Sequence, residues 1–178
     1  MPQLNLRVDA KPTNPGIAGF VEALRAQAPL HTATLAPAAE VVLPQRNPDQ
    51  TVDLRLAGPL PGYTWPINGK LYDPPNNGIG LTKDTRVRVR LVSDSMMFHP
   101  MHLHGRTFQV VGRQGPRARK DTVLVPPEQT VEVDFDTANP GRWIVHCHND
   151  YHLDGGHGDI LRLRRVNFPS VPCVSTLD

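Results

Sequence analysis

The chain has 178 residues, which is enough for one domain with a short appendage and excludes large multidomain machinery. Its 39% hydrophobic and 20% charged residues are typical of a folded protein with a substantial core. The net charge of +2 is too small to follow the phosphates of a nucleic acid, and no apolar run approaches the roughly 18 residues of a membrane span. We therefore expect no nucleic-acid partner and no membrane-spanning segment.

The first 45 residues are broken by prolines and differ from the remainder. One segment has a helical pattern: Asn14 is a suitable cap, Pro15 suits the first helical position, and apolar residues recur at three- and four-residue spacing until Pro29. We interpret residues 1–45 as a linker with one short helix, although its apolar stripe is equally compatible with packing into the core. No basic stretch followed by an apolar one opens the chain, so no export signal is expected in it.

From about Thr51 the hydrophobic period changes to two, as in half-buried strands. Short strands without intervening helices predict an all-β domain over residues 46–168, a β-sandwich or Greek-key barrel, followed by a tail at 169–178. Arg86, Arg88 and Arg90 alternate with apolar residues, and we expect a solvated face rather than an anion-binding stripe. The expected strands are 52–56, 63–68, 86–91, 107–112, 122–125, 130–136, 142–147 and 159–164.

Histidine is the informative residue type, because seven of the eight histidines lie between His99 and His157. They form two dense motifs, residues 99–105 and 146–152. If residues 142–148 are extended, Cys147 points to one face of the sheet while His146 and His148 point to the other. The same alternation in the first motif places His102 and His104 on one face and His99 on the opposite one.

This side-chain alternation predicts two metal sites. One joins two imidazoles and a thiolate, a set associated with type 1 copper: His99, Cys147 and His152, the last placed by its reach from a loop. The other is a four-imidazole cluster suited to copper or zinc: His102, His104, His146 and His148. Zinc storage explains the imidazoles but not the single cysteine between two of them, and a cupin-type site would need an acidic ligand soon after His104. Burying so many imidazoles without a metal would cost several kcal/mol.

The paired motifs His-x-x-His-x-His and His-Cys-His-x-x-x-His resemble the signature of the C-terminal cupredoxin domain of multicopper oxidases, which include laccases. The resemblance covers about residues 51–165 and implies a cupredoxin-like Greek-key β-sandwich or barrel. It implies that type 1 copper takes electrons from a reducing substrate and passes them through His-Cys-His to a cluster that reduces dioxygen to water. The implied ligands are His99, Cys147 and His152 for type 1 copper, His102 for type 2 copper, and His104, His146 and His148 for the type 3 pair.

The sequence departs from the family pattern in two places. His157 stands ten residues after the cysteine, where the family usually has Met, Leu or Phe beside the type 1 copper. Either His157 binds the copper axially or the glycine-rich loop turns its ring to solvent. Multicopper oxidases complete the trinuclear cluster with His-x-His pairs from an N-terminal domain, and beyond the two motifs this chain has no spare pair, since only His31 remains. The trinuclear cluster therefore needs an N-terminal cupredoxin domain or another subunit to complete it.

We expect a copper-binding domain whose isolated chain lacks oxidase activity. The alternatives are a stand-alone mononuclear copper electron-transfer or copper-binding protein, and a remnant that binds no copper. Phenols, cuprous or ferrous ions and small organic reductants all suit the resemblance as donors, which also implies a periplasmic or secreted location. Asp150 and Asp154 are either acceptors for the ligand imidazoles or exposed turn acids.

Overall fold

The computed structural model of the chain describes residues 16–26, 35–76, 78–112 and 115–164. The chain divides into two compact units, Met1–His31 and Thr32–Asp178. The first unit contains helix α1, Gly16–Ala26, which confirms the predicted helix. The proposed cap Asn14, the following Pro15 and the helix-stopping Pro29 lie outside the described residues.

The second unit is built almost entirely from strands. After a single turn of 3-10 helix, η2, at Ala39–Val41, its strands follow one another along the chain, and one short α-helix interrupts them. The elements are β1 (Gln50–Leu56), β2 (Ile79–Thr82), β3 (Arg86–Ser93), β4 (His99–Leu103), β5 (Phe108–Gly112), β6 (Gly115–Lys120), β7 (Thr122–Val125), β8 (Thr130–Asp136), β9 (Arg142–Cys147), α2 (Asp150–Asp154) and β10 (Gly158–Arg164).

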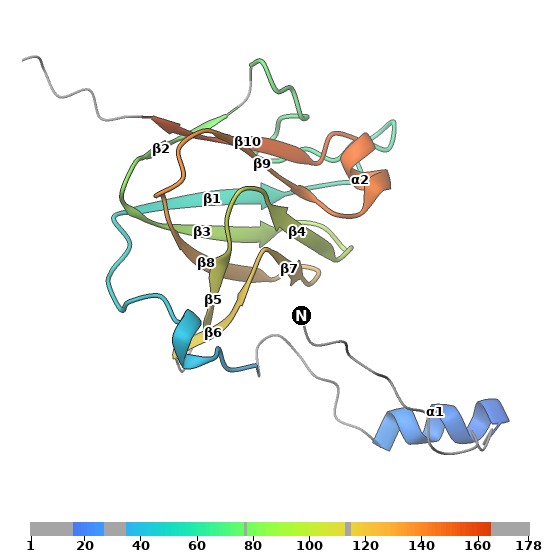
Figure 1. Cartoon of the computed structure of the whole chain (residues 1–178). Helices are drawn as coiled ribbons and strands as arrows, with labels where there is room; N and C mark the ends of the chain where they lie inside the picture. The colour runs from blue at the N-terminus through green and yellow to red at the C-terminus, as the bar shows by residue number, and fades with distance from the viewer. Residues whose placement is uncertain (1–15, 27–34, 77, 113–114, 165–178) are drawn as a thin grey trace, which may run out of the picture. The chain divides into compact units, whose positions relative to one another are not determined.

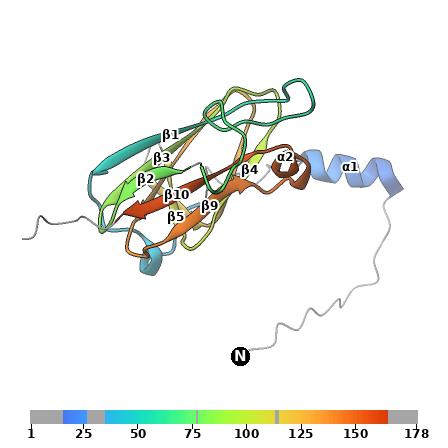
Figure 2. The same ribbon diagram turned by 90° about the horizontal axis from the view of Figure 1, so that it is seen from above.

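These strands form two five-stranded sheets, shown in two views in Figures 1 and 2. One sheet has the order β1-β3-β8-β5-β6 and the other the order β2-β10-β9-β4-β7. Strands β1 and β3 pair in parallel, as do β2 and β10, and the other neighbours pair antiparallel. The result is the predicted cupredoxin-like sandwich, in which β4 and β9, the strands of the two histidine motifs, lie next to each other.

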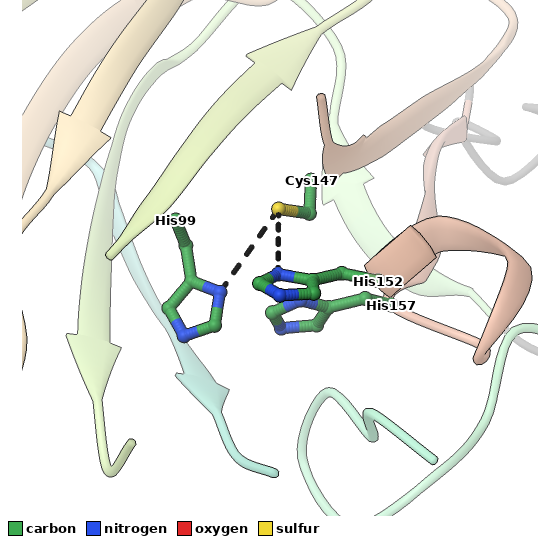
Figure 3. Close-up of side chains that lie close together, drawn as sticks. All are labelled: His99, Cys147, His152 and His157. Atoms are coloured by element: carbon green, nitrogen blue, oxygen red, sulfur yellow. Dashed lines mark hydrogen bonds between the residues drawn. The ribbon is translucent and has the colours of Figure 1, made fainter. Parts of the chain in front are cut away.

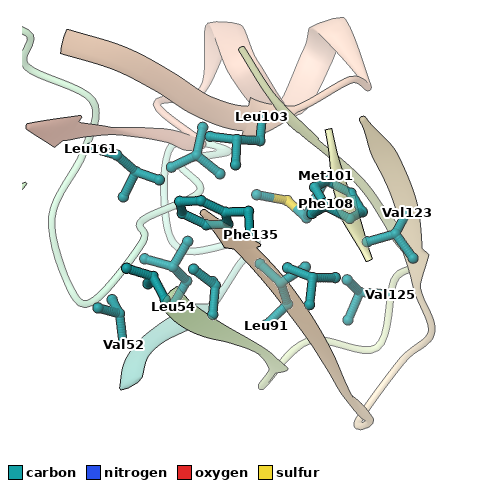
Figure 4. Close-up of a cluster of buried hydrophobic side chains, with 14 of the residues drawn as sticks. Val52, Leu54, Leu91, Met101, Leu103, Phe108, Val123, Val125, Phe135 and Leu161 are labelled. Carbon is teal, nitrogen blue, oxygen red and sulfur yellow. The ribbon is translucent and has the colours of Figure 1, made fainter. Parts of the chain in front are cut away.

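The core lies between the sheets because apolar residues alternate with polar ones along each strand. In β1, Val52, Leu54 and Leu56 are buried while the residues between them are exposed. They meet Phe108 and Phe135 and the buried face of β4 in one cluster, drawn in Figure 4. Cys147 belongs to the same cluster, so its sulfur is at the end of an apolar core.

The predicted strand at residues 63–68 is wrong. Tyr63 and Asn68 both have positive φ, 59° and 52°, and the segment pairs only through isolated bridges. Such φ values end an extended run, so the segment turns at both ends. The Asn68 side chain accepts a bond from the Arg55 amide at 2.8 Å and donates one to the Asp53 carbonyl at 2.9 Å. The Asn68 side chain thereby makes hydrogen bonds to β1 that the backbone of a paired strand would otherwise make.

The arginines of β3 also differ from expectation, because they pair with the neighbouring strand β8. Arg86 is only 3% exposed and makes a bidentate contact with Asp136, at 2.7 and 3.0 Å. Arg88 makes the same contact with Asp134, at 2.8 and 2.9 Å. The strand register places each arginine opposite its partner. Ion pairs therefore join β3 to β8 on this face of the sheet. Arg86 is buried there and does not face solvent as expected.

Among the described residues, no helix is long and apolar enough to cross a membrane. The expected limits of the domains, at residues 45 and 168, remain predictions. Residues near the first limit contact the sandwich: the Leu43 amide donates to Gln109 Oε1 at 2.8 Å, and Arg86 donates to the Pro44 carbonyl at 3.2 Å.

Candidate metal centres

The two histidine motifs face each other across one strand pair. Met101 lies opposite Cys147 and His102 lies opposite His146 in the antiparallel register of β4 and β9. Paired residues in such a register share a face, and successive residues alternate between faces. Cys147 therefore faces the core with Met101, while His146 faces the other side with His102. This is the division that the alternation predicted.

The core side holds a group that we call the closed site: His99, Cys147, His152 and His157. All four are buried, and their ligand atoms lie within 4.8 Å of one another. Cys147 Sγ is 3.4 Å from His152 Nδ1 and 3.9 Å from His99 Nδ1. Dashed lines mark these two contacts in Figure 3. A metal about 2.3 Å from sulfur and about 2.0 Å from nitrogen, in a trigonal arrangement, needs these donors roughly 3.8 Å apart. The donor set of the closed site thus fits a metal ion.

Burial determines the protonation of the closed site. It raises the pKa of the Cys147 thiol to about 11 and lowers the pKa of His99 to about 4, with a smaller contribution from His152. Burial, with His99 and His152 nearby, lowers the pKa of His157 to about 3. The metal-free site is therefore a neutral thiol among neutral imidazoles, and a cation that displaces the thiol proton would remove the cost of the buried polar atoms.

Local structure explains how His152 reaches the sulfur. Asn149 caps α2, because its side-chain oxygen accepts a bond from the Tyr151 amide. The resulting helical turn brings His152 back toward Cys147. Asn149 Nδ2 also lies 3.3 Å from His152 Nε2, on the side of the ring opposite the sulfur. One residue thus begins the helix and orients the imidazole.

A tryptophan covers the closed site. Trp65 is fully buried and stacks on the His152 ring, with centroids 3.8 Å apart and an interplanar angle of 24°. It also meets His99 edge-on at 5.7 Å. Gly155 allows this packing, since a Cβ there would come within 2.6 Å of both the Trp65 ring and the Tyr63 carbonyl. The stack excludes water from the imidazole faces.

The opposite side of the sheet carries the open site, which we define as His102, His104, His146 and His148. The ligand atoms of His102, His104 and His146 lie within 4.8 Å of one another. The His148 ring is further out, 5.8 Å from those of both His102 and His146. His104 and His148 are exposed, so this cluster faces outward.

Hydrogen bonds fix which nitrogens of the open site are available. His102 Nδ1 lies 2.9 Å from the Asp121 carbonyl, and His146 Nδ1 lies 2.8 Å from the Cys147 carbonyl. A carbonyl only accepts, so each Nδ1 carries the proton and each Nε2 keeps a lone pair. The Nε2 atoms of His104 and His146 are 3.0 Å apart. Burial, followed by the neighbouring imidazoles, lowers the pKa of His104, which suits metal binding.

The structure brings together the ligand atoms of the closed site and those of His102, His104 and His146, while His148 lies outside the second group. Sequence reasoning missed the residues that contact these side chains. Asn149 and Trp65 contact His152, and the Asp121 carbonyl holds His102. Asp150 and Asp154, considered as acceptors for the ligands, are exposed. The capping role of Asn149 could have been predicted from the sequence, because Asn is a common residue at the N-terminal cap of a helix. Nothing in the sequence indicated the stacking of Trp65.

Comparison with known proteins places the chain in a family. Multicopper oxidase MmcO of Mycobacterium tuberculosis is 42% identical over 113 residues, covering 62% of this chain and 22% of that protein. Copper resistance protein A of Pseudomonas syringae pv. tomato is 37% identical over 114 residues, covering 62% and 18%. The chain thus spans about a fifth of the curated relatives it matches.

Solved structures agree on the fold. A multicopper oxidase from Campylobacter jejuni superposes with a TM-score of 0.62 at 22% identity, over 70% of this chain and 32% of that one. The McoA multicopper oxidase of Aquifex aeolicus gives 0.58 at 28% identity, over 69% and 31%. The family model for multicopper oxidases matches residues 45–158. With this match and the copper-type ligand set of the closed site, the chain belongs to the multicopper oxidase family, whose cofactor is copper.

Proposed function

We propose that this chain is the copper-binding C-terminal domain of a multicopper oxidase. In this proposal the closed site is the type 1 copper site, and the open site is half of the trinuclear site at which dioxygen is reduced to water. One observation carries the proposal: the Cys147 side chain belongs to the closed site, while the side chain of the preceding residue, His146, belongs to the open site. A single peptide unit therefore joins the two groups.

The closed site holds its metal through His99 Nδ1, Cys147 Sγ and His152 Nδ1. Copper in such a set supplies a one-electron step between its two oxidation states. The protein surroundings keep the ligands in place before a metal arrives, because Trp65 already stacks on the His152 ring. The buried thiol must lose its proton when the metal binds, so we expect loading to release protons.

Cys147 and His146 form the shortest covalent route between the sites. A second route crosses a hydrogen bond, since His146 Nδ1 donates to the Cys147 carbonyl at 2.8 Å. Both routes begin at Cys147 and end on the His146 ring, whose Nε2 faces His104. His148, the other neighbour of Cys147, is exposed on the same side as His102. The route therefore ends in the half-cluster.

The open site needs further ligands, which we propose come from an N-terminal cupredoxin domain or from another subunit. Its exposure supports this proposal, because the exposed rings of His104 and His148 leave room for a partner surface. The reducing substrate is a small molecule or a metal ion, with dioxygen as the electron acceptor. The isolated chain is accordingly expected to lack oxidase activity.

A stand-alone copper carrier is the second candidate. The observation that favours it is that the closed site takes all its ligands from this chain. A carrier would bind one copper in the closed site and would make no use of the open site.

Titration of the purified metal-free chain with copper tests the proposal and separates it from the carrier. We expect one copper with a thiolate-to-copper absorption band, and a second, weaker copper that is lost in the double variant His102→Asn/His104→Asn. A total of one copper per chain in both proteins would support the carrier. Oxygen consumption with a hydroquinone at a rate typical of laccases would contradict the need for a partner, and the absence of a thiolate band would contradict the closed site as a type 1 site.

A further inference from the structure

His157 occupies the closed site and does not turn to solvent. Its side chain is 0% exposed, and its ring meets that of His99 edge-on with centroids 4.6 Å apart. It lies 6.0 Å from both the Trp65 and the His152 rings. Figure 3 shows the ring beside His152, with the sulfur above both. Of the two alternatives left by the sequence, the structure excludes the solvent-facing ring.

Backbone bonds hold His157 in this position. Its carbonyl accepts a bond from the Cys147 amide at 3.1 Å, and its own amide donates to the His152 carbonyl at 3.0 Å. The two bonds tie the residue to two of the proposed copper ligands. The following residue, Gly158, pairs with His146 in the register of β10 and β9. Movement of the ring out of the site would therefore require rotation against a fixed backbone in a packed environment.

The His157 ring nitrogens have no evident use in the protein. Both Nδ1 and Nε2 are buried without a hydrogen-bond partner in the described part of the chain. A buried imidazole that makes no hydrogen bond loses its hydration without compensation, which destabilises the folded protein. Buried polar groups in native proteins are nearly always paired, so such a ring indicates an absent partner. The ligand atoms of His99, Cys147 and His152 lie within 4.8 Å, which makes a metal the natural partner.

We propose that His157 is a fourth ligand of the closed site, so that copper there is held by three imidazoles and one thiolate. This inference rests on the proposed function of the closed site as the type 1 centre. It departs from the family pattern, in which Met, Leu or Phe stands at this position.

A strong fourth ligand changes the properties of the centre. With copper bound, a third imidazole would compete with the thiolate for the metal. The copper–sulfur bond weakens, and the oxidised ion, which prefers nitrogen ligands and four-coordination, is stabilised. The site therefore has a lower reduction potential than one with methionine at position 157. It consequently accepts electrons from strong reductants and only slowly from weak ones.

Spectroscopy of the copper-loaded chain tests the proposal, with His157→Met as the principal variant. We expect the wild-type chain to be green or red, with its long-wavelength thiolate band reduced several-fold. The His157→Met chain should be intensely blue and should have a higher reduction potential in a redox titration. The variant His31→Asn is the matched control, because it removes the one histidine outside the closed and open sites and should leave the colour and potential unchanged.

Pulsed electron paramagnetic resonance on the wild-type chain gives a second readout that needs no variant. Three strongly coupled nitrogens at the thiolate-bound copper support the proposal. Two coupled nitrogens, with a blue band equal to that of His157→Met, overturn it while leaving the type 1 assignment intact. The complete absence of a thiolate band from the wild-type chain overturns the type 1 assignment, and this inference with it.

Discussion

The closed and open sites lie on opposite faces of the same two strands and differ in almost every physical property. The closed site is buried, contains the thiol and takes all its ligands from this chain. The open site contains only imidazoles, two of which are exposed. Under the proposed assignment, one chain would complete a mononuclear centre in its core and would present an incomplete cluster at its surface.

Strand geometry is the reason the two sites are so close yet so different. Successive side chains on a strand point to opposite faces, so Cys147 and His146 have different surroundings although they are neighbours in the chain. Cys147 belongs to the apolar core cluster, whereas His146 faces His104. The same alternation in β4 separates Met101 and Leu103 from His102 and His104.

The largest effect is expected from Cys147→Ser, which removes the one ligand that links the two sites. The thiolate-to-copper band should disappear completely, because a serine hydroxyl is a poor donor for copper at neutral pH. Absorption spectra of the copper-loaded chain measure the loss. The control is Cys173→Ser, which replaces the other cysteine of the chain and should keep the full band. A band that survives in Cys147→Ser would assign the colour to a different ligand.

The double variant His102→Asn/His104→Asn tests whether the sites are independent. Copper at the open site should be lost, while the thiolate band of the closed site stays within error of the wild type. The free energy of unfolding of the metal-free protein should change by no more than about 1 kcal/mol, because His104 is exposed and His102 half-buried. Metal analysis and denaturant titration provide the two measurements. A weakened thiolate band would show that the loss of copper from the open site affects the closed site, and would contradict the independence of the two sites.

The substitution Asp136→Asn breaks the ion pair with Arg86 between β8 and β3 and should lower the free energy of unfolding. Removal of one partner of a fully buried pair costs about 3–5 kcal/mol. The Asp136 side chain is 39% exposed, however, so we expect a smaller loss, about 2 kcal/mol. Urea unfolding of the metal-free protein measures it. The far-UV spectrum should stay unchanged, since the amide oxygen of the substituted side chain can still accept one hydrogen bond from Arg86.

The same ion pair predicts that the free energy of unfolding depends on pH. The hydrogen bond from Arg86 lowers the pKa of Asp136 in the folded protein. The Asp136 carboxylate therefore binds a proton more readily in the unfolded state. The ion pair contributes its full stabilisation at pH values above the unfolded-state pKa of about 4. It is lost as the pH falls through the lower folded-state pKa. The difference in unfolding free energy between wild type and Asp136→Asn should shrink over this acidic range, and a constant difference would exclude the pair as its cause.

The smallest effect on copper binding is expected from Gly155→Ala, which changes the packing of the closed site without removing a ligand. The added methyl group would meet the Trp65 ring and the Tyr63 carbonyl at 2.6 Å, so the packing over His152 must shift. Overpacking of this kind costs about 1–3 kcal/mol. The copper band of the closed site should broaden, whereas copper binding at the open site should not change.

Much of the fold was predictable from the alternation of apolar and polar residues. The strand at 142–147 and the strand at 130–136 agree with β9 and β8 in both limits. The strand expected at 63–68 failed because Tyr63 and Asn68 adopt positive φ. An aromatic residue rarely does so, whereas Asn68 before Gly69 is a common turn pair. Arg86 was expected to face solvent, and its burial depends on Asp136, which is fifty residues away in sequence.

By itself, the sequence determined the division of ligands between two faces, because alternation is a property of any extended strand and Cys147 stands between two histidines. Only the tertiary structure decided the direction of the His157 ring, since a glycine-rich loop permits both orientations and the choice depends on packing against His99 and Trp65. It also decided the orientation of His152, which depends on the cap of a five-residue helix and on a stacked tryptophan distant in sequence. Local periodicity reports which way a strand residue faces, whereas the position of a loop residue depends on contacts that form only in the folded chain.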